Sequence, residues 1–440
     1  MANLMRYALQ SGSEAAGYDL TPSDLTHALE KEGARITYTD SADEIPPQFR
    51  DKEKTLVVYT PAVPDSNRIL SWFRDRGFEV VKRSRLLGLI TADTDSICVA
   101  GSHGKTTTCS MTANILRSSH LGCNAFLGGI LRNTGSNLVL DPSSKISVAE
   151  ADEYDRSFHQ LSPRIAVITS CDPDHLDIYG NEENYREAFA HFTSLIRPGG
   201  TLLLRKGVNV EPRGVENVFS YSAHEGDFHA ENIGFRPDHR LQFDIVGPDM
   251  RIDGVSLANP VEINVENAVA AAAASHIAGA TDDEIRRGLD SFLGAKRRFE
   301  IHLDKPGVPV LIDDYAHSPN EIESSIASIR KAFPGRKLTV IFQPHLYTRT
   351  RDFAPGFAKA LSKADETVLT EIYPARELPI PGVTSALIAD ALDNNHLLLR
   401  RADLLEYIKN RKFDILMTLG AADLDRLLPD IKKILENKAL

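Results

Sequence analysis

Cysteine is scarce in this 440-residue sequence, and its placement excludes several kinds of site. The four cysteines, Cys98, Cys109, Cys123 and Cys171, lack the close pairing of a zinc site or a redox motif. We therefore expect four reduced thiols, as in a protein of the cytoplasm.

Long hydrophobic runs are also absent. The nearest candidate, residues 268–274, is an Ala-rich stretch broken by Ser275 and His276. It falls far short of the ~18–20 apolar residues that a membrane helix needs. The first residues, Met1-Ala2-Asn3-Leu4, do not have the layout of a signal peptide. These absences predict no membrane partner and a cytoplasmic location.

Positive charge is in deficit, with 50 Lys and Arg against 61 Asp and Glu, a net charge of −11. An acidic chain is a poor candidate for a broad nucleic-acid surface, so no nucleic-acid partner is expected. A local basic pocket for a small anion is still compatible with this charge. Hydrophobic residues at 42% and charged residues at 25% are typical of a folded, globular chain and exclude a disordered one.

What the sequence does contain is an alternation of strands and helices in three blocks, residues 1–93, 94–293 and 294–440. This alternation is typical of an α/β fold with parallel sheets. In the first block, Thr55–Tyr59 is predicted to be a buried strand. Thr21 is predicted to cap the helix that starts directly after Thr21. A length of 440 residues agrees with roughly two to four domains.

The strongest local signal is a phosphate-binding loop. An apolar strand, Ser96–Ala100, runs into Gly101-Ser102-His103-Gly104-Lys105-Thr106-Thr107, which opens a helix. Backbone N–H groups at such a helix start can hold phosphate, a lysine can reach the terminal phosphates, and a threonine hydroxyl can bind magnesium. The spacing is the shorter G-x-x-G-K-T, because the position five before Gly104 is Val99. The alternative is an ordinary turn between a strand and a helix.

Two acidic clusters follow apolar strands downstream of the loop. Residues 150–155 (EADEYD) come after the strand 146–149, and residues 172–177 (DPDHLD) come after the strand 165–169. The carboxyl ends of parallel strands lie beside the phosphate loop, and carboxylate oxygens suit Mg²⁺. Taken alone, either run is equally compatible with a solvated loop. Together they predict a nucleoside triphosphate site with one or two metal ions.

At this point the chain resembles the Mur ligases of peptidoglycan synthesis, and the resemblance covers nearly its whole length. Its carriers are the phosphate loop and six further blocks in the same order. These are residues 150–158 (EADEYDRSF), 172–177 (DPDHLD), 264–268 (NVENA), 296–300 (KRRFE), 313–319 (DDYAHSP) and 343–351 (QPHLYTRTR). The last two blocks favour the branch that adds L-alanine.

The resemblance implies three domains and one reaction. The domains are a Rossmann-like UDP-binding domain (residues 1–93), a central P-loop ATPase domain with a parallel sheet (94–293) and a C-terminal Rossmann-like α/β domain that closes over the active site (294–440). The implied reaction uses ATP to phosphorylate the lactyl carboxylate of UDP-N-acetylmuramate. The amine of L-alanine then attacks the acyl phosphate. The protein is expected to act as a monomer or a homodimer.

The resemblance also implies roles for individual residues. Lys105, Glu150, His175 and Arg298 are the implied catalytic residues. Two Mg²⁺ sites are implied, one held by Thr106 and Glu150, the other by Glu150 and His175. Implied ATP contacts are Gly101, Ser102, His103, Gly104, Lys105, Thr106, Thr107, Asn264, Asn267, Arg298 and Asp314. Implied substrate contacts are Asp19, Thr60, Asn137, Tyr315, His317, His345 and Arg349.

Several positions depart from the family pattern. Ile263 replaces a frequent histidine before the first asparagine, Ser170 replaces an asparagine, and Leu346 replaces a frequent arginine. Several sister ligases carry a carbamylated lysine that residues 185–189 (YREAF) lack. The alanine-adding branch is expected to lack this lysine too. The family opens with a strand and a Gly-rich turn, whereas this chain begins at the methionine that ends that turn. We expect a start codon assigned too late and a longer working protein.

Two alternatives stay open. One is a truncated form or pseudo-enzyme that binds ATP but not the UDP-sugar, which the missing turn favours and the intact Lys105, Thr106, Glu150 and His175 oppose. The other is the murein-peptide recycling ligase. Its Pro-rich signature is not matched by residues 19–23 (DLTPS).

Overall fold

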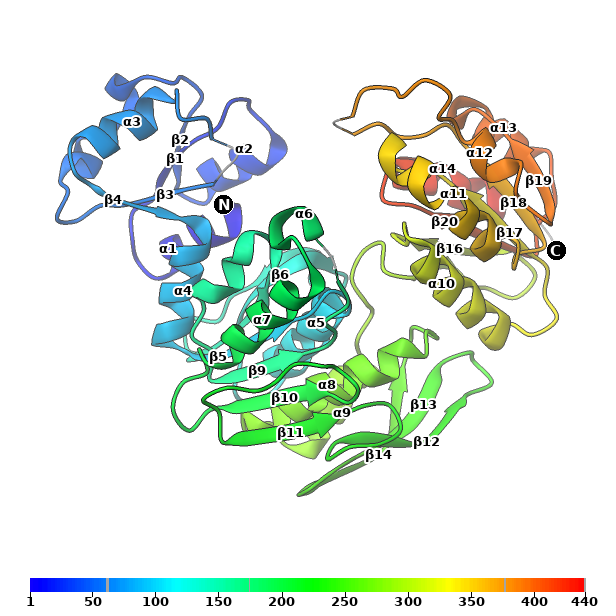
Figure 1. The fold of residues 1–440 in the computed structure, drawn as a ribbon, viewed down its shortest axis with the longest axis horizontal. Coiled ribbons are helices and arrows are strands. Elements are labelled where there is room, and N and C mark those ends of the chain that lie inside the picture. Colours follow the sequence, from blue (N-terminus) through cyan, green and yellow to red (C-terminus); the bar gives the residue numbers. More distant parts are fainter. Residues whose placement is uncertain (61–62, 174, 376, 439–440) are drawn as a thin grey trace. The chain divides into compact units, whose positions relative to one another are not determined.

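The computed structural model describes residues 1–60, 63–173, 175–375 and 377–438. They form two compact units (Figure 1). The first unit comprises Met1–Glu231, Ile245–Ile252 and Glu266–Leu289, and the second comprises Asn232–Asp244, Asp253–Val265 and Asp290–Leu440.

The N-terminal part of the first unit contains two separate two-stranded parallel sheets, β1-β2 and β3-β4. A small apolar core around Ile45, Phe73 and Phe78 packs against Val57 of β3 and Val80 of β4. The elements are α1 (Ala2–Gln10), β1 (Ala16–Tyr18), α2 (Asp24–Lys31), β2 (Arg35–Thr37), β3 (Leu56–Tyr59), α3 (Arg68–Asp75), β4 (Glu79–Lys82) and α4 (Arg83–Asp93).

Two expectations for this region were wrong. Strand β3 is not buried, because Leu56 is 39% exposed and the other residues of the strand are only partly covered. A strand of a parallel sheet is buried where other elements cover both faces of the sheet, and the faces at β3 are only partly covered. Ser23, rather than Thr21, caps α2: its Oγ accepts from Thr26 N at 3.2 Å, and Thr26 Oγ1 accepts from Ser23 N at 2.9 Å.

The large sheet of the first unit has seven strands in the order β11-β10-β9-β5-β8-β6-β7. All neighbours pair in parallel except β6 and β7. The strands are β5 (Asp95–Ala100), β6 (Asn124–Leu131), β7 (Ser136–Val139), β8 (Ile146–Ala151), β9 (Ile165–Ile168), β10 (Thr201–Arg205) and β11 (Asn217–Tyr221). Ala100 is paired with Ala151 on one side and with Ile168 on the other. The carboxyl ends of β8, β5 and β9 therefore lie next to one another.

Helix α5 (Lys105–Arg117) packs against β5, β6 and β8 of this sheet, and the same unit contains α6 (Leu176–Tyr179), α7 (Glu182–Thr193) and α9 (Asp282–Asp290) (Figure 1). Helix α8 (Ile263–Ile277) contains the Ala-rich stretch, and residues 268–274 are completely buried in it. A smaller sheet has the order β12-β13-β14, with strands His229–Phe235, Leu241–Gly247 and Met250–Leu257. In the described residues, no helix combines the length and the apolar character needed to cross a membrane.

The second unit is built on a six-stranded sheet of order β15-β16-β20-β17-β18-β19, parallel except at β15. Two apolar clusters cover it, one including Ile312 and Phe342, the other Leu311 and Leu416. The strands are β15 (Glu300–Leu303), β16 (Val310–Asp314), β17 (Leu338–Phe342), β18 (Glu366–Leu369), β19 (Asn395–Leu398) and β20 (Ile415–Leu419). The helices are α10 (Pro319–Ala332), α11 (Tyr347–Leu361), α12 (Ala386–Ala389), α13 (Leu404–Lys409) and α14 (Leu428–Glu436).

The last strand of this sheet, β20, is inserted between β16 and β17. The chain thus reverses its direction of winding here, and ligands of open α/β sheets bind outside the carboxyl ends of strands at such a point. The predicted α/β class with parallel sheets is confirmed.

Candidate active site

The loop between β5 and α5 has the geometry of a phosphate cradle. Gly101 and Gly104 have φ values of 141° and 84°, which side chains rarely adopt. A Cβ on Gly101 would lie 2.1 Å from Thr169 Oγ1, and one on Gly104 would lie 2.9 Å from Asn267 Oδ1. Ser170, which follows the neighbouring strand β9, holds the loop in place, because its Oγ accepts from His103 N at 2.7 Å. Both glycines are therefore required for the backbone to turn this tightly.

Lys105 is held by a buried carboxylate at the start of α5. Its Nζ donates to Glu153 Oε1 at 2.9 Å and also to the carbonyl oxygen of Gly101. Glu153 is 2% exposed, and its own carbonyl accepts from the Tyr179 hydroxyl at 2.5 Å. Sequence reasoning placed Glu153 in the acidic run but gave it no role. Only the fold shows which carboxylate of that run meets the lysine.

Glu150 lies within β8, one residue before its end, rather than after the strand as the sequence suggested. Its Oε2 accepts from Thr106 Oγ1 at 3.2 Å, and its Oε1 accepts from Gly128 N in β6 at 2.7 Å. A hydroxyl and a carboxylate at the start of a phosphate-binding helix are the oxygen donors that Mg²⁺ prefers. The residues present therefore fit a magnesium ion. Within the described part of the chain, no group of three His, Cys, Asp or Glu side chains is clustered for a metal.

His175 has a left-handed backbone (φ 52°), and its carbonyl accepts from Ile178 N and Tyr179 N where α6 begins. Its ring lies 5.2 Å from that of Tyr154, edge to face. Asp174 of the same block lies outside the described residues. Ser102 Oγ, in the loop, contacts the Tyr185 hydroxyl at 2.9 Å and donates to the carbonyl of Asp172 at 2.5 Å.

The two asparagines expected at adenine lie inside α8, three residues apart, and are 6% and 7% exposed. Asn264 is the second residue of that helix. Asn267 Oδ1 accepts from Thr108 Oγ1 at 3.2 Å, so this residue lies against the phosphate-loop helix.

The N-terminal substrate candidates are spread over different elements of the first unit. Asp19 follows β1, and its Oδ1 accepts from Thr21 N at 3.2 Å. Thr60 follows β3, and its carbonyl accepts from Val63 N. Asn137 lies in β7, where its carbonyl accepts from Asn3 Nδ2 of α1 at 3.1 Å. The structure does not gather these three into one cluster with the phosphate loop.

The remaining candidates gather at the carboxyl ends of the strands of the second unit. Asp314 ends β16 and accepts from Phe299 N at 3.2 Å and from Ser325 Oγ. Burial raises the pKa of Asp314. The Arg298 guanidinium lies over the Tyr315 ring, 5.2 Å from its centroid.

Two histidines of this group are partly buried beside an arginine. Burial lowers the pKa of His317, as does the nearby Arg349, while Glu321 opposes them. Burial, Arg349 and His317 lower the pKa of His345, whose ring is stacked on Tyr373. A pKa below the ordinary value near 6.5 leaves both imidazoles neutral at pH 7. Helix α11 begins at Tyr347, so Arg349 lies in its first turn.

Known proteins are similar to this chain over its full length. A Parabacteroides distasonis protein named UDP-N-acetylmuramate–L-alanine ligase is 53% identical over 439 residues, 99% of this chain and 95% of that protein. The chain belongs to the Mur ligase family. A Phocaeicola vulgatus protein of the same name is 51% identical over 100% of the chain and 96% of its own length. These matches confirm the resemblance seen in the sequence motifs.

Three models of the Mur ligase family match successive parts of the chain. "Mur ligase family, catalytic domain" matches residues 1–94, "Mur ligase middle domain" residues 99–275, and "Mur ligase, glutamate ligase domain" residues 297–422. The solved UDP-N-acetylmuramate-alanine ligase of Thermotoga maritima is similar with a TM-score of 0.77 and 26% identity, over 99% of this chain and 96% of that one. A murein peptide ligase of Psychrobacter arcticus shares the fold, with a TM-score of 0.61, 21% identity and coverage of 100% of this chain and 97% of that one.

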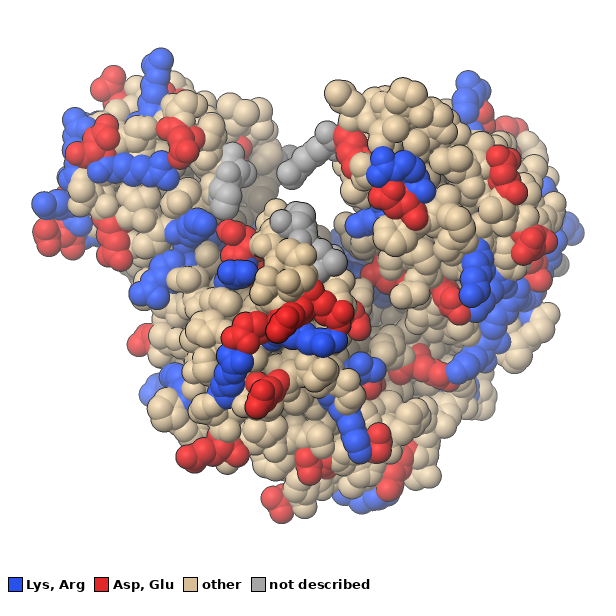
Figure 2. Space-filling model, viewed as in Figure 1, with Lys and Arg blue, Asp and Glu red and all other residues tan. Residues whose placement is uncertain are grey.

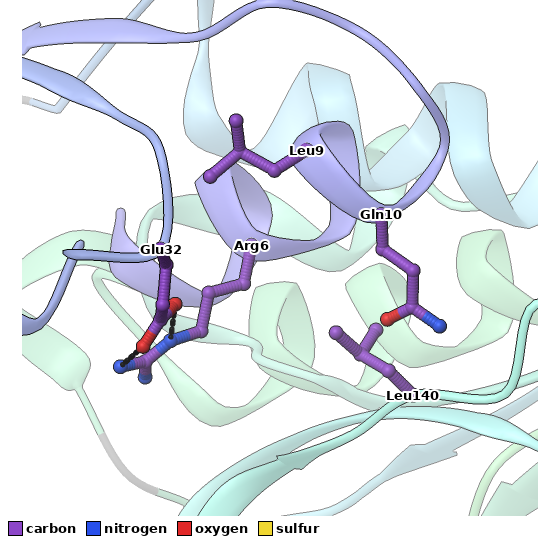
Figure 3. A pocket seen from close by; sticks show the side chains of 5 residues that line it. All are labelled: Arg6, Leu9, Gln10, Glu32 and Leu140. Carbon is purple, nitrogen blue, oxygen red and sulfur yellow. Dashed lines mark hydrogen bonds and ion pairs between the residues drawn. The ribbon is translucent and has the colours of Figure 1, made fainter. Parts of the chain in front are cut away.

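Charge of neither sign dominates the face of the molecule that is shown in Figure 2. Basic and acidic side chains are interspersed over the visible face (Figure 2). A shallow pocket of about 320 Å³ is lined by Arg6, Leu9, Gln10, Glu32 and Leu140 (Figure 3). Glu32 receives two hydrogen bonds from Arg6, at 2.7 and 2.8 Å, so the charges of this pocket already neutralise each other.

Proposed function

We propose that this Mur ligase joins L-alanine to the lactyl carboxylate of UDP-N-acetylmuramate, driven by ATP through an acyl phosphate. One observation carries the proposal. A chain similar over its full length to ligases of that name holds Lys105, Thr106 and Glu150 together at its phosphate loop. The product is a precursor for peptidoglycan, so the protein serves cell-wall synthesis. The cytoplasm is the proposed location of this step.

The chemistry explains why a nucleotide site is needed. A carboxylate oxygen is a poor leaving group, so the carboxylate first takes the γ-phosphoryl group, and ADP leaves. The alanine nitrogen then attacks the carbonyl carbon, the carbon–oxygen bond to phosphate breaks, and the nitrogen loses a proton. Lys105 offsets the charge on the transferring phosphoryl group, and Arg298 contributes the same way. Neutral His317 and His345 can approach the substrate amine without repelling it.

Magnesium is assigned to the oxygen donors at the loop. When bound, it supplies charge neutralisation for the phosphoryl group. Thr106 and Glu150 would hold one ion, and Glu150 with His175 a second. The backbone of residues 101–107 would hold phosphate, while Asn264, Asn267 and Asp314 would bind the nucleoside.

The substrate roles are divided among three domains. Residues 1–93 would bind the UDP portion, 94–293 ATP, and 294–440 L-alanine and the muramoyl group. Their respective contacts would include Asp19 and Thr60 in the first domain and Asn137 in the second. Tyr315, His317, His345 and Arg349 would serve the third.

L-Alanine dependence tests the proposed function. With the purified full-length chain, ATP, Mg²⁺ and UDP-N-acetylmuramate, we expect phosphate release to require L-alanine. D-Alanine, glycine and L-serine serve as matched controls and are expected to support slower release. Release that is independent of L-alanine would exclude the function. Release supported only by a murein peptide would favour the recycling ligase. ATP binding without any release would favour a form unable to bind the UDP-sugar.

A second prediction concerns the support of Glu150. A Cβ added at Gly128 would lie 2.5 Å from Glu150 Oε2, so Gly128→Ala must displace that carboxylate. We expect the Mg²⁺ concentration for half-maximal activity to rise about 10- to 100-fold. Gly234→Ala is the matched control, because a Cβ there has no neighbour within 4 Å in the described structure. Equal Mg²⁺ titrations for both variants would contradict the assignment of Glu150 to the metal.

A further inference from the structure

Arg297, the residue before Arg298, has a side chain held by three hydrogen bonds. Arg297 donates from Nη2 to the carbonyl of Gly420 at 2.6 Å and from Nη1 to that of Ala422 at 2.8 Å. Its Nε donates to Asp313 Oδ2 at 3.4 Å. These three acceptors lie at the carboxyl ends of β16 and β20. The fork geometry of a guanidinium suits several fixed acceptors at once.

The backbone around Arg297 is also fixed. Its carbonyl accepts from Tyr315 N at 2.7 Å, and its N–H donates to Glu300 Oε2 at 3.0 Å. Arg297 and Phe299 have φ values of 60° and 47°, in the left-handed region. Such residues cost on the order of 1–3 kcal/mol each and persist only where the surroundings determine them. The turn that carries Arg298 is thus held in one conformation by its neighbours.

Arg297 and Arg298 share one aromatic platform. Their guanidinium carbons lie 5.1 and 5.2 Å from the centroid of the Tyr315 ring. Among the described residues, the Arg298 side chain forms no hydrogen bond or ion pair, so its donors are available to a ligand. The donors of Arg297 are engaged with carbonyls and a carboxylate. The two adjacent arginines therefore have different tasks.

We infer that Arg297 is a positioning residue that fixes the turn and the Tyr315 ring on which Arg298 is presented to ATP phosphate. The inference rests on the proposed function, in which Arg298 contacts that phosphate. Arg297 itself touches no reacting group. Its removal is expected to misplace Arg298, and a misplacement of about 1 Å can cost up to about 100-fold in rate.

Arg297→Lys is the informative variant, because it keeps a positive charge beside the buried Asp313, but its single ammonium nitrogen cannot replace the three separate guanidinium nitrogens that donate to Asp313, Ala422 and Gly420. We expect kcat/KM for ATP to fall between about 10- and 100-fold. Arg336→Lys is the matched control. Arg336 also bonds a carboxylate and a carbonyl, both of Asp414, and lies over the Phe333 ring. The Arg336→Lys variant should have a lower melting temperature and an unchanged KM for ATP.

A double-mutant cycle separates positioning from an independent effect. If Arg297 acts through Arg298, adding Arg297→Lys to Arg298→Ala should slow the enzyme by less than about twofold further. Losses that multiply, or an Arg297→Lys variant matching the wild type, would overturn the inference. If Arg298→Ala alone keeps full activity, the role of Arg298 in the proposed function is wrong as well. If Arg298→Ala slows single-turnover phosphate release and the losses of the two single variants multiply in the double variant, only the positioning inference is overturned.

Discussion

Lys105→Ala is expected to reduce phosphate release by at least about 10²–10³-fold, because it removes the charge that compensates the transferring phosphoryl group. The effect should lie in kcat, since the lysine's contact with the phosphoryl group strengthens as transfer proceeds. Single-turnover phosphate release with saturating ATP and UDP-N-acetylmuramate measures it directly. Lys206→Ala is the matched control, because Lys206 forms an exposed ion pair with Glu225 in the same unit.

Loss of activity in Lys105→Ala has a second possible source, which a further variant separates. Without Lys105, the carboxylate of Glu153 stays buried and unpaired, which typically costs about 3–5 kcal/mol of stability. The double variant Lys105→Ala with Glu153→Gln removes that stranded charge. We expect it to recover melting temperature but not activity. Recovery of phosphate release together with stability would show that Lys105 is only structural.

The phosphate loop could be predicted from sequence because every part of it is local. An apolar strand, two glycines with positive φ and a helix follow one another directly, so residues 101–107 needed no tertiary information. The acidic run that begins at Glu150 was predicted to lie beside the loop, because the carboxyl ends of neighbouring parallel strands share one sheet edge, and Glu150 accepts from Thr106 there. Its support by Gly128 was not found. Gly128 is 22 residues away in sequence and meets Glu150 only through the pairing of β6 with β8.

Strand β3 in the N-terminal part shows a different limit of prediction from the sequence. The apolar sequence of Thr55–Tyr59 predicts a strand correctly, but burial depends on what covers the two faces of its sheet. In the described residues β3 pairs only with β4, and the faces of this small sheet are incompletely covered, so Val57 and Val58 stay partly exposed. The cap at Ser23 was missed for a local reason, because Thr21 and Ser23 are both capping residue types and only the backbone shows which one bonds Thr26.

The sequence block of residues 296–300 pointed to Arg298 through the family resemblance, yet two arginines stand side by side there. Side-chain type cannot distinguish them. The distinction comes from β20, which is last in the sequence but lies between β16 and β17 and brings the carbonyls of Gly420 and Ala422 to Arg297. Contacts separated by more than 120 residues are set by sheet topology, and no local pattern encodes them.

Glu150→Gln is the second change with a large expected effect. The substitution keeps the size of the side chain but removes the charge that would hold Mg²⁺. Both oxygens now accept hydrogen bonds, from Thr106 Oγ1 and Gly128 N. An amide offers only one acceptor, so its NH₂ group must face one of these donors. We expect activity at moderate Mg²⁺ to fall by about 100-fold or more, because metal stabilisation of the phosphoryl charge is worth several kcal/mol.

Magnesium titration distinguishes loss of the metal from loss of the fold. Glu150→Gln should recover part of its activity as Mg²⁺ is raised, whereas a misfolded variant would not respond. Glu187→Gln is the matched control, since Glu187 is bonded to Arg213 on the surface of the same unit, and its titration should follow the wild type. Because Thr106 would remain as a ligand, Thr106→Val combined with Glu150→Gln should abolish the recovery. Wild-type activity of Glu150→Gln at low Mg²⁺ would remove both proposed metal sites, since both depend on this carboxylate.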